Sequence, residues 1–270
     1  MRPHIRSASM RLAPLILLPL LMMLIVPVGC APLHASRSSL HLDPHAADSV
    51  QGRPIRVWTR TAKGVATRHT TRNGPAQSPR VLIIGSIHGD EPEGLRALPH
   101  VQRAIEAVPA VTIRIIEDAN PDGTAHGTRT NARGVDLNRN WPTANFAAKA
   151  RHGTSPLSEP ESRFLYEQIR EFAPTLIIVY HSARNGPFVN FDGPAEQHAA
   201  AFAHAAAVSD PRWHVRPSMG YPTPGSLGTW AGVEQQIPIL TVEFDRNHDP
   251  EPVEHAIVAG TLAVLNNLAQ

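Results

Sequence analysis

Four apolar runs of strand length alternate with longer segments along this chain, and this alternation constrains the fold more than any other feature of the sequence. Each run has six to eight residues and is rich in Val, Ile and Leu. The runs are VLIIGSI (81–87), VTIRII (111–116), TLIIVY (175–180) and IPILTVEF (237–244). Such runs are typical of strands that are buried on both faces. Strands that alternate with helices predict an α/β fold.

The segments between these runs carry helix signals. Ser158 and Glu161 fit the pattern of a capping box, and Pro160 stands in the first turn, where proline is tolerated. Residues 119–157 show little periodicity, and a loop of that length in a compact domain is usually functional. The predicted helices span residues 91–108, 158–172, 195–208, 226–235 and 253–268, and an opening strand spans 55–59.

The N-terminus has the layout of a secretory signal. Residues 1–12 contain three arginines and no acidic residue, and residues 13–28 form an uncharged apolar run. Cys30 follows Gly29, which resembles a bacterial lipoprotein processing site, so we expect residues 1–30 to be a signal peptide of that type. A soluble export signal cleaved nearby and an uncleaved inner-membrane anchor are the alternatives. The resemblance to such lipoproteins implies a lipid-anchored periplasmic protein, and Ala31 after the cysteine, in place of Asp, favours the outer membrane.

The remaining sequence is expected to form one domain. Residues 31–53 are polar and rich in Ser, His and Ala, which predicts a flexible tether, and residues 54–270 form the predicted catalytic domain. Hydrophobic residues make up 42% of the 270 residues, enough for one sizeable core.

Charge and cysteine content exclude several functions. Without residues 1–29, 22 basic and 23 acidic side chains remain, so nothing indicates nucleic-acid binding. Cys30 is the only cysteine, so disulfides and a catalytic thiol are excluded from the domain.

A histidine and a glutamate stand three residues apart at the end of the first apolar run. The strand ends at His88, the next helix begins at about Glu91, and Gly89 allows the turn between them. Zinc binds imidazole nitrogen and carboxylate oxygen at about 2 Å, so this pair can share one ion. Taken alone the spacing is weak, because an ordinary surface turn also contains it.

His181 follows the third apolar run directly. Open α/β sheets bind ligands at the carboxyl ends of their strands, so we expect His181 to meet His88 and Glu91 there. In isolation, a half-buried histidine with a hydrogen-bond partner is the simpler interpretation. Two histidines and one glutamate leave the fourth zinc position open for water, which is the catalytic pattern, and one zinc ion per chain is expected.

Glu243 closes the fourth apolar run. A carboxylate at the end of an apolar strand is costly unless it has a partner or a task. One interpretation is a salt-bridged glutamate. The other is a general base that takes a proton from zinc-bound water and passes it to the leaving amine.

The stretch RTNARGVDLNRNWP at residues 129–142 brings arginines into the long loop. Beside a zinc site, an arginine can stabilise an oxyanion or hold a carboxylate through paired hydrogen bonds. A solvated basic loop is the alternative.

Six short motifs occur in an order that resembles the M14-type zinc metallocarboxypeptidases: HGDE, NPDG, RTNARGVDLNRNWP, SEPES, YHS and TVEF. The resemblance covers about residues 80–245, and YPTPGSLGTW followed by PILTVEF looks closest to the murein peptide amidase branch. It implies a single α/β domain of the zinc carboxypeptidase, phosphorylase/hydrolase-like type. Its mixed, mostly parallel sheet would have eight strands flanked by helices.

The resemblance also implies the catalytic roles. His88, Glu91 and His181 match the family's zinc ligands, and Glu243 matches its catalytic glutamate. Arg129 matches the arginine that stabilises the oxyanion.

Substrate-binding roles follow in the same way. Asn138 and Arg139 match the pair that binds the substrate's terminal carboxylate. Tyr221 lies near the place of the mobile substrate tyrosine, and Leu227 lies close to the specificity position of the side-chain pocket. Asp90 stands where the digestive members carry arginine.

The implied activity is a zinc-dependent exopeptidase or amidase that acts next to a free carboxylate. The expected substrate is a murein peptide, cut between γ-linked D-glutamate and diaminopimelate. A deacylase of N-acyl amino acids, of the aspartoacylase and succinylglutamate desuccinylase type, is one alternative. A non-catalytic wall-binding lipoprotein that keeps the fold is another.

Overall fold

The computed structural model describes residues 39–63, 70–71, 74–75, 78–246 and 250–270. The predicted signal peptide (1–30) and the first part of the predicted tether lie outside the described residues. Ser38–Gln270 forms a single structural unit. Within the part that is described, no helix has the length and apolar character needed to cross a membrane.

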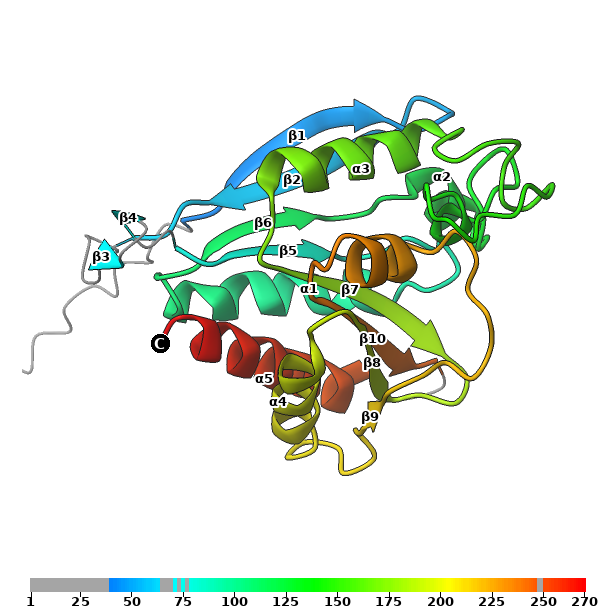
Figure 1. Cartoon of the computed structure of the whole chain (residues 1–270). Coiled ribbons are helices and arrows are strands. Elements are labelled where there is room, and N and C mark those ends of the chain that lie inside the picture. Colours follow the sequence, from blue (N-terminus) through cyan, green and yellow to red (C-terminus); the bar gives the residue numbers. More distant parts are fainter. Residues whose placement is uncertain (1–38, 64–69, 72–73, 76–77, 247–249) are drawn as a thin grey trace, which may run out of the picture. The chain divides into compact units, whose positions relative to one another are not determined.

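One mixed sheet of eight strands forms the centre of this unit (Figure 1). The four strands in the middle, β6, β5, β7 and β10, run parallel, while β1, β2 and β8 join antiparallel to a neighbour. In spatial order the strands are β1 (His41–Asp48), β2 (Pro54–Arg60), β6 (Thr112–Ile116), β5 (Arg80–Ile84), β7 (Leu176–Ala183), β10 (Ile239–Asp245), β8 (Phe188–Asp192) and β9 (Val215–Arg216). A separate two-stranded pair joins β3 (Thr70–Thr71) and β4 (Gly74–Pro75).

Both faces of the sheet are covered, and the middle strands place buried apolar side chains on each face. In β7, Ile178 and Tyr180 join the hydrophobic cluster on one face, while Ile177 and Val179 join the cluster on the other. Alternate side chains of a strand point to opposite faces, so an unbroken apolar run is what a doubly covered strand requires.

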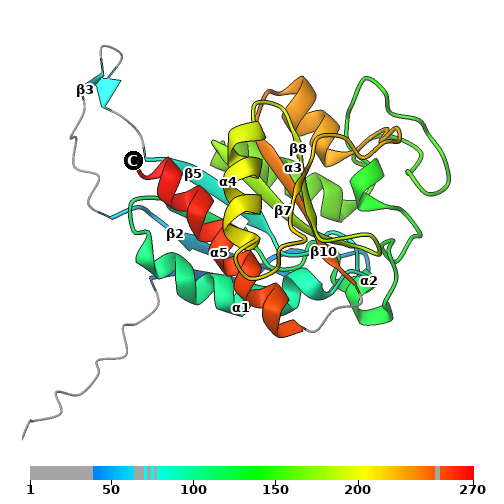
Figure 2. The same ribbon diagram turned by 90° about the horizontal axis from the view of Figure 1, so that it is seen from below.

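Helices pack against each face (Figures 1 and 2). The cluster that contains Ile178 and Tyr180 is covered by α1, α4 and α5, with α5 lying between the other two. The opposite cluster is covered by α3 and the short η3. The helices are α1 (Glu93–Ala104), α2 (Pro121–His126), α3 (Pro160–Phe172), α4 (Glu196–Ala206) and α5 (Pro250–Leu268), with single turns η1 (Ile105–Ala107), η2 (Leu137–Arg139) and η3 (Thr229–Glu234).

The predicted boundary at residue 54 needs correction. Residues 41–48, assigned to the tether, form the edge strand β1, which pairs antiparallel with β2. Ala46 and Ala47 pack against the core, and the other β1 side chains are mostly exposed. A polar edge strand of this kind lacks the apolar run by which a strand is predicted from sequence.

The predicted capping box does not form. The N-cap of α3 is Glu159, and the Ser158 hydroxyl donates to the Glu159 carboxylate and accepts from no amide of the helix. Glu161 accepts from the Val50 amide and from Asn131, so its carboxylate ties the N-terminal segment to the loop that follows Arg129.

Candidate metal centre

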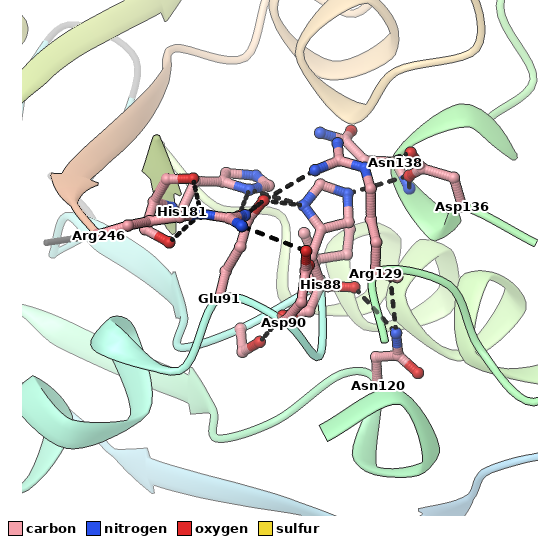
Figure 3. Close-up of polar contacts among 12 residues, drawn as sticks. His88, Asp90, Glu91, Asn120, Arg129, Asp136, Asn138, His181 and Arg246 are labelled. Carbon is pink, nitrogen blue, oxygen red and sulfur yellow. Dashed lines mark hydrogen bonds and ion pairs between the residues drawn. The ribbon is translucent and has the colours of Figure 1, made fainter. Parts of the chain in front are cut away.

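Three buried side chains meet at the carboxyl ends of β5 and β7. His88 lies just after β5, Glu91 lies just before α1, and His181 lies near the end of β7. The Nδ1 atoms of His88 and His181 are 3.1 Å apart, His88 Nδ1 is 3.1 Å from Glu91 Oε1, and His181 Nδ1 is 2.8 Å from Glu91 Oε2 (Figure 3). The parallel pairing of β5 with β7 brings these segments, 90 residues apart in the chain, to one edge of the sheet.

This donor set fits a zinc ion. Ligands about 2 Å from a tetrahedral ion lie about 3.3 Å from one another, close to the three separations seen here. Two imidazole nitrogens and one carboxylate are also the ligands that catalytic zinc takes, with a fourth position left for water. Among the described residues, this is the one group of three side chains with the geometry of a metal site.

Asp136 orients His88 from behind. Its Oδ1 lies 3.0 Å from His88 Nε2, and its Oδ2 accepts from Arg129 Nε at 2.9 Å. Burial acts to raise the pKa of Asp136, but the hydrogen bond and charge of His88 and the charge of Arg129 outweigh it, so the pKa lies below its ordinary value. An ionised Asp136 keeps the proton on His88 Nε2 and leaves the Nδ1 lone pair facing the metal position.

We expect Asp136→Asn to weaken zinc binding by about 10- to 100-fold, because the His88 ring loses the carboxylate that fixes its tautomer. Competition with a zinc chelator of known affinity measures the change. Asp43→Asn on the exposed β1 strand is the control, and an unchanged zinc affinity in Asp136→Asn would show that Asp136 does not orient the ligand.

Two guanidinium groups form ion pairs with the Glu91 carboxylate. Arg129 Nη1 and Arg246 Nη2 both donate to Glu91 Oε1 at 2.8 Å (Figure 3). Arg246, at the end of β10, also donates to Ser182 O at 3.0 Å and pairs with Asp90 at 3.3 Å. The guanidinium group of Arg246 therefore lies beside Asp90, the aspartate that stands where the digestive enzymes carry arginine.

Asn120 joins Arg129 to the end of β5. Its side chain accepts from the Gly123 amide as the N-cap of α2, and its amide group donates to the carbonyls of Ile87 and Arg129 (Figure 3). The NPDG motif therefore caps and begins a helix that holds two parts of the site together.

Gly89 is required by a close approach of α2. A Cβ on Gly89 would lie 1.9 Å from the Gly123 carbonyl carbon. We expect Gly89→Ala to displace His88 and Glu91 and to lower activity about 10²-fold, the usual effect of misplacing a catalytic group by about 1 Å. Steady-state kinetics and zinc content measure this.

Gly127→Ala is the control for that variant, since its Cβ would meet no atom within 4 Å and its left-handed backbone (φ 62°) costs only stability. Full zinc content and activity in Gly89→Ala would show that the contact with α2 does not fix the positions of His88 and Glu91.

Glu243 faces the metal position from β10. It pairs in register with His181 on the parallel strand β7, so both side chains point to the same face of the sheet. Burial raises the pKa of Glu243 above its ordinary value, although the charge of His181 opposes this. A carboxylate whose basicity is increased in this way is suited to accept a proton.

The remaining predicted residues surround a pocket of about 570 Å³. Asn138 and Arg139 come from η2, and Asn138 Oδ1 accepts from the Leu227 amide at 2.9 Å. Tyr221 stands on the pocket lining with 55% of its surface exposed. Leu227, predicted to lie at the base of the pocket, is instead 2% exposed, packs in the core and is not among the lining residues.

Eight of the nine predicted site residues therefore line one pocket. They are His88, Glu91, Arg129, Asn138, Arg139, His181, Tyr221 and Glu243. Asp136, Arg246 and the polar side chains of β8 and β9 were not predicted from the sequence. Asp136 had one signal, its place in the arginine-rich stretch; Arg246 had none, because its partners lie 64 residues or more away in the chain.

Comparisons with known proteins agree with this geometry. A family model described as zinc carboxypeptidase matches residues 33–248. Murein peptide amidase A of Escherichia coli (strain K12) is 31% identical over 195 residues, which cover 66% of this chain and 76% of that protein. Murein peptide amidase A of Vibrio campbellii is also 31% identical over 195 residues, covering 63% of this chain and 72% of that protein.

Solved structures share the fold. The crystal structure of a murein-tripeptide amidase from E. coli O157 matches with a TM-score of 0.60 at 23% identity, covering 85% of this chain and 92% of that chain. Carboxypeptidase A from Helicoverpa armigera matches with a TM-score of 0.64 at 20% identity, covering 86% of this chain and 69% of that chain.

Proposed function

This chain belongs to the zinc carboxypeptidase family, and from that premise we propose that it hydrolyses the amide bond between γ-linked D-glutamate and diaminopimelate in murein peptides. Family membership makes it a peptide hydrolase. The murein substrate is supported above all by the 31% identity to murein peptide amidase A over 195 residues.

Asn138 and Arg139 would bind the free carboxylate of the substrate. Both residues line the pocket that His88 and His181 also line. Arg139 Nη1 donates to the Asn138 carbonyl at 2.6 Å, which holds the guanidinium in place. A carboxylate bound there fixes the amide bond of the terminal residue over the metal position.

Glu243 and Arg129 would carry out the hydrolysis. His88, Glu91 and His181 would hold the zinc ion, which when bound would lower the pKa of a water molecule and polarise the carbonyl. Glu243 accepts a proton from the water as its oxygen bonds to the carbonyl carbon, and Arg129, with a third of its side chain exposed, stabilises the oxyanion. Glu243 then passes that proton to the amine nitrogen as the carbon–nitrogen bond breaks.

Three substrates test this proposal. The purified, zinc-loaded protein is incubated with L-Ala-γ-D-Glu-diaminopimelate, with N-acetylaspartate and with an α-linked peptide that ends in phenylalanine. We expect diaminopimelate to be released from the first and little product from the others. Cleavage of N-acetylaspartate alone would indicate a deacylase, and cleavage of the phenylalanine peptide alone would indicate an ordinary carboxypeptidase.

We also propose that the protein is exported and lipid-anchored through Cys30. The support is the sequence of residues 1–30 alone, which lie outside the described residues. Mass spectrometry of the mature N-terminus tests this: a diacylglyceryl-modified Cys30 is expected, and an intact Met1 or an unmodified N-terminus would refute it.

A further inference from the structure

Two oppositely charged side chains in the pocket take no part in the mechanism above. Asp192 ends strand β8 and Arg216 ends strand β9, and both line the same pocket as Glu243. Within the part of the chain that the structure describes, neither makes an ion pair or a side-chain hydrogen bond.

Sheet register shows how these side chains lie relative to the catalytic glutamate. Asn190 pairs with Thr241 of β10 on one side and with Arg216 of β9 on the other. Asp192 pairs with Ile239, which precedes Glu243 by four residues on the same face of β10. Asp192 and Arg216 therefore lie on the face of the sheet that carries the catalytic residues, and both line the pocket.

The Asp192 carboxylate has no cationic partner among the described residues. Burial raises its pKa above the ordinary value, and no neighbouring charge offsets this. Gly228 and Gly232 of the segment at η3 make room for it, because a Cβ on Gly228 would lie 2.2 Å from Asp192 Oδ2 and one on Gly232 would lie 2.4 Å from Asp192 Cβ. A half-buried carboxylate without a partner is costly in the free protein, which is expected where a ligand supplies the cation.

The guanidinium group of Arg216 packs on the Phe188 ring, and its N–H groups remain available as hydrogen-bond donors. Its guanidinium lies 4.0 Å from the centre of the Phe188 ring, and its carbonyl accepts from Asn190 Nδ2 at 2.8 Å. Stacking on an aromatic ring fixes the plane of a guanidinium while its N–H groups remain free to bind a carboxylate in that plane.

We propose that Asp192 and Arg216 form the subsite for the far end of the substrate's terminal side chain, where Asp192 binds an ammonium group and Arg216 binds a carboxylate. This inference rests on the proposed function, since Asn138 and Arg139 must hold the other carboxylate. It specifies a terminal residue whose side chain ends in both an amine and a carboxylate, as that of diaminopimelate does. The pair, and not Leu227, then determines the specificity.

A set of four peptides separates the two contacts. Each has the form L-Ala-γ-D-Glu-X, with X as diaminopimelate, lysine (which lacks the second carboxylate), 2-aminopimelate (which lacks the second amine) or norleucine (which lacks both). The variants are Asp192→Asn and Arg216→Gln, and the controls are Asp48→Asn and Arg56→Gln on the exposed surface. The readout is kcat/KM for each combination.

Asp192→Asn is expected to lower kcat/KM about 10- to 100-fold for the diaminopimelate and lysine peptides, the usual effect of losing a charged hydrogen bond, and to change the 2-aminopimelate peptide less than about 3-fold. Arg216→Gln is expected to lower kcat/KM for the diaminopimelate and 2-aminopimelate peptides and to leave the lysine peptide nearly unchanged. Equal losses on all four peptides, or no loss on any, would overturn the proposal.

A binding measurement keeps the two proposals separate. Calorimetry with free diaminopimelate and the zinc-loaded protein requires no hydrolysis. If the wild type cleaves no murein peptide, the proposed function fails, and the subsite stands only if both variants still weaken diaminopimelate binding at least about 10-fold. If the wild type cleaves the peptide but both variants bind and cleave normally, the function stands and the subsite is refuted.

Discussion

Glu243→Gln is expected to lower kcat by about 10²- to 10⁴-fold, the range that a positioned general base contributes. Glutamine keeps the shape of the side chain but cannot accept the proton of the attacking water. Glu243 lies in register with His181 and is 7% exposed, so the loss is chemical and the surrounding structure has no reason to change. Substrate binding should be retained, because the proposed carboxylate site at Asn138 and Arg139 does not include Glu243.

Zinc content and melting temperature are the controls for this variant, and both should match the wild type. Glu167→Gln, an exposed glutamate of α3, is the matched substitution and should leave kcat unchanged. A Glu243→Gln protein with wild-type kcat would assign the proton transfer to another group. One that had lost its zinc would leave the role of Glu243 in catalysis unsupported.

His181→Ala is expected to abolish activity together with zinc binding. The variant removes one of three donors that lie within 3.1 Å of one another, and the two that remain cannot close a three-ligand site. Chelation of the wild type should have the same effect on activity, and restoring zinc should return it. Zinc that binds only the native state should also raise the melting temperature. The expected stabilisation is about 4 kcal/mol when the free zinc concentration is 1,000 times the dissociation constant.

His204→Ala is the matched control, because His204 lies on the exposed side of α4. It should keep full zinc content and activity. Full activity in metal-free wild-type protein, or in His181→Ala, would exclude the metal from the reaction.

The parallel centre of the sheet could be predicted because burial on both faces leaves an unmistakable pattern. The strands β5, β6, β7 and β10 contain the four apolar runs. The candidate zinc ligands and Glu243 could be predicted to meet for a related reason, since they stand at or just after the ends of these runs, and parallel strands bring their carboxyl ends to one edge.

Strands β8 and β9 were not predicted from the sequence because they carry polar residues that line the pocket. One face of β8 lines the pocket with Asn190 and Asp192, and β9 is two residues long and ends in Arg216. A strand with polar residues has no continuous apolar run, which is the pattern by which a buried strand is predicted. The charged residues of the pocket therefore interrupt the pattern in β8 and β9.

Contacts between distant segments could not be predicted from spacing. Arg246 reaches Glu91 across 155 residues, and Asp136 reaches His88 across 48. Leu227 was placed in the pocket by position in the chain, but the turn that precedes η3 directs its side chain into the core while its amide donates to Asn138.

The proposed mechanism depends on one zinc ion held at the carboxyl ends of β5 and β7. Diffraction from crystals of the zinc-loaded protein, recorded on both sides of the zinc absorption edge, measures this directly. A single anomalous peak per chain, bonded to Nδ1 of His88, Nδ1 of His181 and the carboxylate of Glu91, is the predicted result. A zinc peak elsewhere, or none at these three side chains in active protein, would contradict it.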